Sequence, residues 1–159
     1  MCRSVLSGSM ETSLRFPSTK IKGNANYTLF HVARYNDSAV YVPGPFGSCN
    51  RMIGTSGFDN WWSGFYACRQ TIAYHYKGVV GPSDWVYAAD VDVSSGPSKY
   101  KWVISSDMAT QYRSDGVVRG KEATEGSAPG QDLLINPGWG DGEYSHWLFA
   151  EVRGGRGWR

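Results

Sequence analysis

Runs of aromatic and β-branched residues recur along the chain between polar stretches, and each run predicts a short strand. The first, YTLFHVARY at 27–35, is the richest in such residues. Further strands are predicted for RMIGTS at 51–56, DWVYAADVDV at 84–93, KYKWVIS at 99–105 and EYSHWLFAEVR at 143–153. The 84–93 strand is expected to be central in its sheet.

One segment instead follows the period of an α-helix. Its apolar residues are separated by steps of four, three, four and four, which places them on one helical face. They are Trp61, Phe65, Cys68, Ile72 and Tyr76. Asp59 stands where an N-cap residue is favoured, and Gly78 where a helix commonly ends. The pattern predicts a helix over 59–77.

The order strand, strand, helix, strand, strand, long loop, strand predicts an α+β fold. We expect a single compact domain over 27–152, with two small mixed sheets around a cleft and a flanking helix. A length of 159 residues suits one domain. Residues 1–26 form a polar lead-in in which SGSM resembles a cloning remnant, and 153–159 form a basic Gly/Arg tail. The Gly-rich, acidic stretch 113–142 is expected to be a long loop that is functional or disordered.

Composition and charge limit the classes of function. The chain has 20 Gly and seven Trp, which is typical of a strand-rich and loop-rich domain, and its net charge of +2 is too small to indicate a nucleic-acid partner. No run of apolar residues approaches the length of a membrane-spanning helix.

The three cysteines include no CxxC pair, so a zinc site is not expected. Cys49 and Cys68 either form a disulfide, if the protein is exported, or remain two buried thiols. The histidines are expected to pack in the core or face solvent, and their spacing to Ser and Asp does not indicate a hydrolase. They are His31, His75 and His146.

Three stretches, in this order, resemble the signature of the mono-ADP-ribosyltransferase toxins of the cholera and pertussis type. HVARYNDS carries Arg34 on a predicted strand, MIGTSGFDNWW carries Thr55 and Ser56 at a strand end, and GDGEYSHW carries Glu143 after the long loop. The resemblance spans about 27–152. It implies an enzyme that cleaves NAD at the nicotinamide–ribose bond and transfers ADP-ribose to a macromolecular acceptor, more readily a protein than a nucleic acid. It also implies a secreted or delivered toxin or effector.

The resemblance assigns roles to these residues. Arg34 would bind the NAD phosphates through its bidentate guanidinium, and Thr55 or Ser56 would orient the catalytic carboxylate. That carboxylate is Glu143, which would bind the ribose hydroxyl and stabilise the oxocarbenium-like charge. Asp141 would select the target.

Within the 120–142 loop, expected to be mobile, Trp139 would contact the target. The chain departs from the family pattern at Gly54, where the first Ser is usual, at Ala33, where an aromatic residue is usual, and at Asp141, where Glu or Gln is usual.

Each motif also has a structural interpretation. Arg34 can be a surface or ion-paired residue, Thr55 and Ser56 can cap a turn, and Glu143 can be a solvated carboxylate. The alternative function is a β-rich, lectin-like carbohydrate-binding module, in which Trp139 or Trp158 stacks on a sugar. A third hypothesis, nucleic-acid binding, rests on the VRGGRGWR tail.

Overall fold

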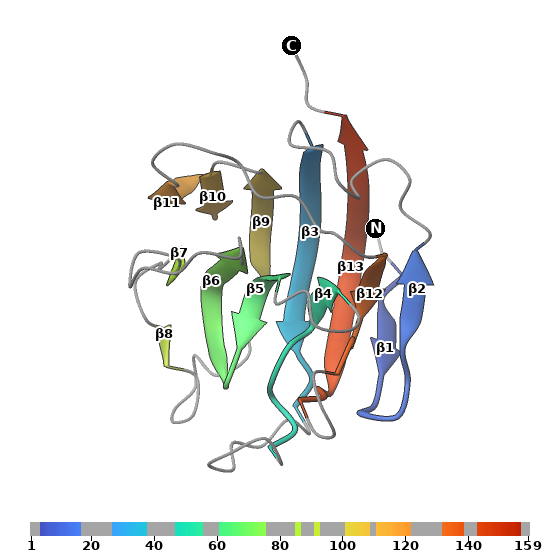
Figure 1. The fold of residues 1–159 in the computed structure, drawn as a ribbon. Helices are drawn as coiled ribbons and strands as arrows, with labels where there is room; N and C mark the ends of the chain where they lie inside the picture. The colour runs from blue at the N-terminus through green and yellow to red at the C-terminus, as the bar shows by residue number, and fades with distance from the viewer. Residues whose placement is uncertain are drawn as a thin grey trace.

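The structure of the protein is a computed structural model. Its described part consists of two antiparallel β-sheets (Figure 1). The structure describes residues 4–16, 27–37, 47–55, 61–75, 85–86, 91–92, 101–108, 111–121, 132–138 and 143–156. Every strand pair in these ranges is antiparallel, and they contain no helix. The described part of the chain is therefore all-β.

The first sheet is built around two long strands. Its six strands, in spatial order, are β1 (Leu6–Gly8), β13 (Trp147–Arg156), β3 (Tyr27–Tyr35), β9 (Val103–Met108), β10 (Gln111–Ser114) and β11 (Val117–Lys121). The long strands β3 and β13 pair along their whole length, from Tyr35 opposite Trp147 to Tyr27 opposite Arg156. This pair forms the centre of the sheet, as the blue and red arrows show in Figure 1.

The second sheet lies against the first and consists of shorter strands. In spatial order they are β2 (Leu14–Phe16), β12 (Leu133–Ile135), β4 (Ile53–Thr55), β5 (Trp61–Tyr66), β6 (Arg69–His75) and β7 (Trp85–Val86), with β8 (Val91–Asp92) also paired to β6. Strands β1 and β2 follow each other in the chain but belong to different sheets. The turn between them therefore crosses from one sheet to the other at the edge of the sandwich.

The main hydrophobic core joins the two sheets. Along β3, alternate residues are fully buried, as expected for a strand with one face on the core. Leu29 and Tyr35 from this strand share a core cluster with Trp61 and Phe65 of β5 and with Trp147 of β13. Burial of these large side chains supplies the main stabilising term of the sandwich.

The predicted α+β fold with a flanking helix is wrong, because the described residues of the 59–77 segment form the β5–β6 hairpin. The step of four between Trp61 and Phe65 fits a strand as well as a helix, since residues four apart share one face of a strand too. The next step, to Cys68, crosses the hairpin turn, where Cys68 has a φ of 59°.

Ile72 then lies in a separate cluster with Trp62, on the opposite face from Trp61. The apparent helical face is thus divided between two faces of a hairpin. The mixed sheets of the prediction are antiparallel sheets instead.

Other segment predictions also need correction. The predicted central strand 84–93 contains two short strands, β7 and β8, and β7 is at the edge of the second sheet. The polar lead-in contains β1 and β2, the long loop contains β11 and β12, and the basic tail begins inside β13. The strand predictions at 27–35, 51–56, 99–105 and 143–153 each contain or overlap an observed strand.

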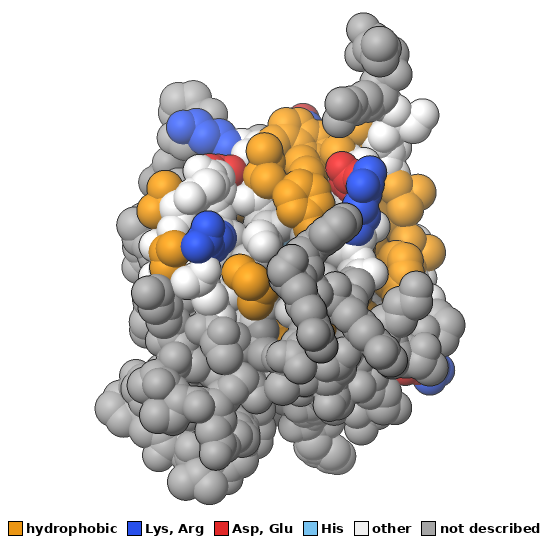
Figure 2. Space-filling view, turned by 90° about the horizontal axis from the view of Figure 1, so that it is seen from above, with side chains coloured by type: hydrophobic (Ala, Val, Ile, Leu, Met, Phe, Trp, Pro, Cys, Tyr) orange, Lys and Arg blue, Asp and Glu red, His pale blue; other side chains and the backbone are white. Residues whose placement is uncertain are grey.

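The outer face of the first sheet is partly apolar. Among the exposed large hydrophobic side chains, Ile104 lies on β9 and Trp102 lies just before it, two residues away and therefore on the same face. Seen from above, one patch of hydrophobic side chains lies at the top centre beside an acidic and a basic side chain, and further hydrophobic side chains lie to its left and right (Figure 2). Side chains on this face point away from the core that joins the sheets.

Candidate functional site

Glu143 is part of a buried charged cluster. Its carboxylate lies 2.5 Å from Nε of Arg51 and accepts a hydrogen bond of 3.0 Å from the hydroxyl of Tyr66. The Arg51 guanidinium also lies 5.5 Å from the centre of the Tyr66 ring. The side chains of Arg51 and Glu143 are only 4% and 13% exposed, so Glu143 is not the solvated carboxylate of the structural interpretation.

Burial and the charge of Glu143 both shift pKa values in this cluster, in opposite directions for Arg51 and in the same direction for Tyr66. Burial lowers the pKa of Arg51, while the charge of Glu143 raises it. Burial also raises the pKa of Tyr66, and the neighbouring Glu143 raises it further. The carboxylate of Glu143 thus favours the charged form of the guanidinium and the neutral form of the phenol. Through these two partners it also holds the segment before β13 against the second sheet.

Arg34 occupies a different part of the molecule. It stands on β3 between the buried residues Ala33 and Tyr35, so its side chain points to the outer face of the first sheet. There it forms an ion pair of 3.0 Å with Asp37, and its guanidinium lies 5.6 Å from the ring centre of Trp102. The structure therefore gives Arg34 partners other than those that hold Glu143.

Of the remaining predicted site residues, one is buried and the others lie outside the described part of the chain. Thr55 is buried at the end of β4, opposite Leu133 of β12. Ser56, Trp139 and Asp141 lie outside the described residues, as does Trp158. Their assigned roles stay predictions.

A buried polar network lies between the sheets. Nε2 of His31 lies 3.1 Å from Oγ of Ser63, while the hydroxyl of Tyr27 donates to Asp107. Burial lowers the pKa of His31 to about 4, although the charge of Asp107 opposes this shift. His31, Ser63 and Asp107 are fully buried, so a substrate cannot reach them in this state.

A pocket of about 650 Å³ opens at the edge of the sandwich, where the β1–β2 turn meets the segment before β13. Its lining residues are Ser9, Met10, Glu11, Ser13, Tyr144 and His146. The first four form one wall, from the turn, and the last two form the opposite wall. The lining combines hydroxyl groups, one carboxylate, one imidazole and one aromatic ring.

Asn136 fixes the turn that forms the first wall. Its amide nitrogen donates to the backbone carbonyls of Ser9, Met10 and Thr12, at 3.2, 2.9 and 3.0 Å. The indole nitrogen of Trp147 donates to the carbonyl of Thr12 as well, at 3.2 Å. The turn is therefore attached to the body of the domain by side chains of β13 and of the residue after β12.

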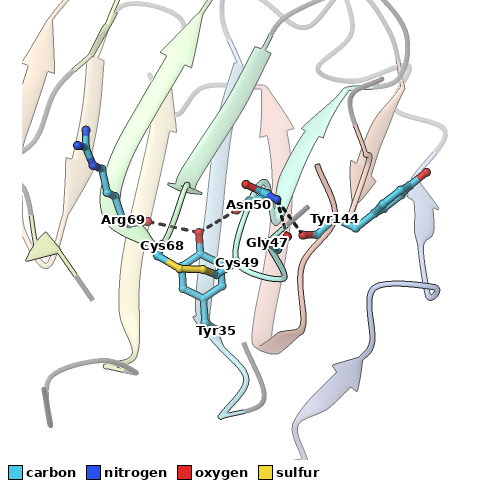
Figure 3. Close-up of a disulfide and its surroundings, with 7 residues drawn as sticks. All are labelled: Tyr35, Gly47, Cys49, Asn50, Cys68, Arg69 and Tyr144. Carbon is cyan, nitrogen blue, oxygen red and sulfur yellow. Dashed lines mark hydrogen bonds between the residues drawn. A yellow bond between two sulfur atoms is a disulfide. The ribbon is translucent and has the colours of Figure 1, made fainter. Parts of the chain in front are cut away.

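The second wall rests on the segment that carries the disulfide. Cys49 and Cys68 are bonded, which decides between the two alternatives left open by the sequence (Figure 3). Cys49 pairs with Ser145 in an isolated β-bridge, and the amide of His146 donates to the carbonyl of Ser48 at 2.9 Å. The backbone between the two wall residues is thereby held in place.

Tyr35 supports the same segment from the core side. Its hydroxyl donates to the carbonyl of Asn50 at 2.8 Å and lies 3.5 Å from the carbonyl of Arg69, so that it connects the two chain segments that the disulfide joins (Figure 3). The side-chain amide of Asn50 donates in turn to the carbonyl of Gly47, at 2.6 Å. Burial raises the pKa of Tyr35 well above its ordinary value, so this hydroxyl keeps its proton.

The pocket residues carry no signal of a binding site in the sequence, and His146 was expected only to pack in the core or face solvent. The turn residues stand in a polar stretch without periodicity, SGSMETS, which gave no signal for a structured wall. A usable signal was the NPG at 136–138, which is a turn signature. Asn136 and Gly138 both adopt positive φ there, of 56° and 58°.

Gly138 is required for the position of the Tyr144 ring. A Cβ at position 138 would lie 2.4 Å from Cε1 of Tyr144, which is far closer than atoms can approach. The ring therefore packs directly over the backbone of the NPG turn.

The described residues contain no group of three His, Cys, Asp or Glu side chains placed to hold a metal ion. Nor do they contain a helix of the length and hydropathy needed to cross a membrane. Comparisons of the chain with known protein families, with curated proteins and with solved structures found no match.

Proposed function

We propose that this protein is a carbohydrate-binding, lectin-like module without enzymatic activity, and that its binding site is the pocket between the β1–β2 turn and the segment before β13. The observation that carries this proposal is the lining of the pocket. It combines the hydroxyls of Ser9 and Ser13 and the carboxylate of Glu11 with the ring of Tyr144.

A sugar matches such a lining chemically. Its hydroxyl groups donate to a carboxylate and exchange hydrogen bonds with serine hydroxyls, while its C–H face packs on an aromatic ring. The volume of about 650 Å³ is within the usual range of small-ligand sites. None of the described lining residues is Lys or Arg, so these residues offer a strongly anionic ligand no positive charge.

The support of the walls favours the same function. Both walls are attached to the domain by hydrogen bonds, and the second is backed by a disulfide. A site whose walls are already fixed loses little entropy when a ligand binds. Disulfides persist in oxidising compartments, where secreted sugar-binding domains act.

The proposal is tested by titrating the ¹⁵N-labelled protein with the methyl glycosides of glucose, galactose, mannose and N-acetylglucosamine. We expect saturable chemical-shift changes at residues 9–13 and 144–146 with at least one of them. Tyr144→Ala should weaken that binding at least tenfold. The matched control is Trp102→Ala, which removes an exposed aromatic ring outside the pocket. Absence of saturable shifts with all four glycosides, or equal losses in both variants, would contradict the proposal.

NAD-dependent ADP-ribosyl transfer is the second candidate. The observation in its favour is that Glu143, the expected catalytic carboxylate, directly precedes the pocket residue Tyr144 and is held by hydrogen bonding. Two observations speak against the transferase: Glu143 is engaged in an ion pair with Arg51, and Arg34 lies on the outer face of the first sheet. Incubation with NAD decides between them: release of free nicotinamide by the wild type, and its loss in Glu143→Gln, would replace the carbohydrate proposal with the transferase.

A further inference from the structure

We infer that Asn136 is the positioning residue of the pocket and joins its two walls into one hydrogen-bonded unit. The inference rests on the proposed function for the ligand, but the joining itself can be measured without any ligand. One side chain serves both walls. Its Nδ2 donates to the carbonyls of Ser9, Met10 and Thr12, and its Oδ1 accepts a hydrogen bond of 2.7 Å from the amide of Ser145.

The position of Ser145 makes this second bond important. Its amide lies between Tyr144 and His146, the two residues of the second wall. The bond from this amide to Asn136 therefore sets how far the second wall lies from the turn. A change in the side chain at position 136 therefore alters the distance between the two walls, and not the position of one wall alone.

The backbone of Asn136 is fixed as firmly as its side chain. The residue is fully buried, its φ is 56°, and its amide donates to the carbonyl of Met52 at 2.7 Å. Asn tolerates this left-handed conformation better than most residues, and its amide group supplies both donors and an acceptor. A residue with donors only or acceptors only at this position could hold one wall and not the other.

Asn136→Asp separates the two halves of this arrangement. The introduced carboxylate has nearly the shape of the amide and still accepts from the amide of Ser145. It loses both donors, however, and faces three carbonyl oxygens. We expect the turn to loosen on that side, while the bond from Trp147 to Thr12 and the pairing of β1 with β13 and of β2 with β12 still hold its ends.

The same variant offers a rescue by pH. A carboxyl group buried among carbonyl oxygens should protonate well above the ordinary aspartate pKa of about 3.9. Once protonated, it can donate one hydrogen bond to the turn. The effect of Asn136→Asp should therefore be large at pH 7.5 and smaller at pH 5, relative to the wild type at each pH. A residue that only contributes stability would not give this recovery in the turn.

The first measurement is the backbone order parameter of residues 9–13 by ¹⁵N relaxation. In the wild type we expect values near the rigid range of about 0.85, and in Asn136→Asp at pH 7.5 a fall towards about 0.6. The matched control for this measurement is Asn50→Asp, because the side-chain amide of the buried Asn50 donates to the backbone carbonyls of Gly47 and Tyr144, at 2.6 and 3.5 Å, but not to the turn. Unchanged order parameters in Asn136→Asp, or an equal fall in the control, would overturn the inference.

The second measurement is the affinity for the methyl glycoside that binds the wild type best. We expect at least a tenfold loss in Asn136→Asp at pH 7.5 and partial recovery at pH 5. Full affinity in a variant whose turn has loosened would overturn the inference. If the wild type binds no glycoside, the proposed function fails, and the order parameters alone decide the role of Asn136.

Should Asn136→Asp not fold, Asn136→Gly takes its place. Glycine adopts the positive φ without strain and removes the whole amide group. The criterion for the order parameters of 9–13 is the same.

Discussion

Acidification should weaken the fold through one buried side chain, His31. It lies fully buried between the sheets, with Nε2 3.1 Å from Oγ of Ser63. Its pKa falls from 6.5 to about 4 because burial disfavours the imidazolium, and the nearby carboxylate of Asp107 offsets only part of this. His31 therefore binds a proton more readily in the unfolded chain than in the folded protein.

The magnitude follows from the two pKa values. Because the folded pKa is the lower one, the contribution is present above pH 6.5 and is lost as the pH falls towards 4. At about 1.36 kcal/mol for each pKa unit, the loss between pH 7 and pH 5 is about 2 kcal/mol. Near pH 4 the loss is about 3 kcal/mol, and it is complete only below that pH.

The assay is urea denaturation at several pH values, with wild type and His31→Gln compared. The variant keeps an amide donor towards Ser63 but cannot be protonated in this range. We expect it to be less stable at pH 7 and to lose about 2 kcal/mol less than the wild type between pH 7 and pH 5. His146→Gln is the control, since it retains His31 and should keep the wild-type loss. The same pH dependence in wild type and His31→Gln would refute the reasoning.

Three further outcomes are expected. Reduction of the Cys49–Cys68 disulfide, which joins residues 19 apart, should lower the free energy of unfolding by about 3 kcal/mol, and an unchanged urea midpoint in reductant would contradict this. Glu143→Gln should cost about 3 kcal/mol or more because it removes the carboxylate that pairs with the buried guanidinium of Arg51, while Glu143→Gln combined with Arg51→Met should recover part of the loss; equal destabilisation of single and double variants would argue against a buried pair. Gly138→Ala should cost at least about 1 kcal/mol, because φ is 58° there and the new methyl group meets the tyrosine ring of the pocket; unchanged ring resonances of that tyrosine in the variant would count against this packing.

Several strands could be predicted from the sequence because their signal is local. The run 27–35 alternates between core-facing and outward side chains, and it forms β3 over the same residues. The run 143–153 likewise overlaps β13. In both segments the residue types favour extended backbone, and burial on one face agrees with that preference.

The hairpin of β5 and β6 was not predictable in the same way. Residues Trp61 to Phe65 are all buried, so the alternation that marks a half-exposed strand is absent. The register also shifts between Gly64 and Phe65, with an extra residue, Thr71, on the paired strand at a φ of 67°. A bulge of this kind disrupts the period-two pattern, so the spacing of the apolar residues resembled that of a helix.

The candidate site shows the same division. The resemblance in the sequence assigned Glu143 a catalytic role, which stays a prediction. Its ion pair with Arg51 joins segments 92 residues apart and has no local signature. The pocket depends on even longer connections, since Asn136 binds the carbonyls of the 9–12 turn.

Strand propensity and the turn at NPG were determined by the sequence itself, through residue types acting on their own backbone. Which strands became neighbours, which carboxylate was buried and which side chains faced the pocket were decided only by tertiary structure. The physical reason is that these features depend on burial and hydrogen bonding between distant segments, and those contacts exist only once the two sheets have packed together.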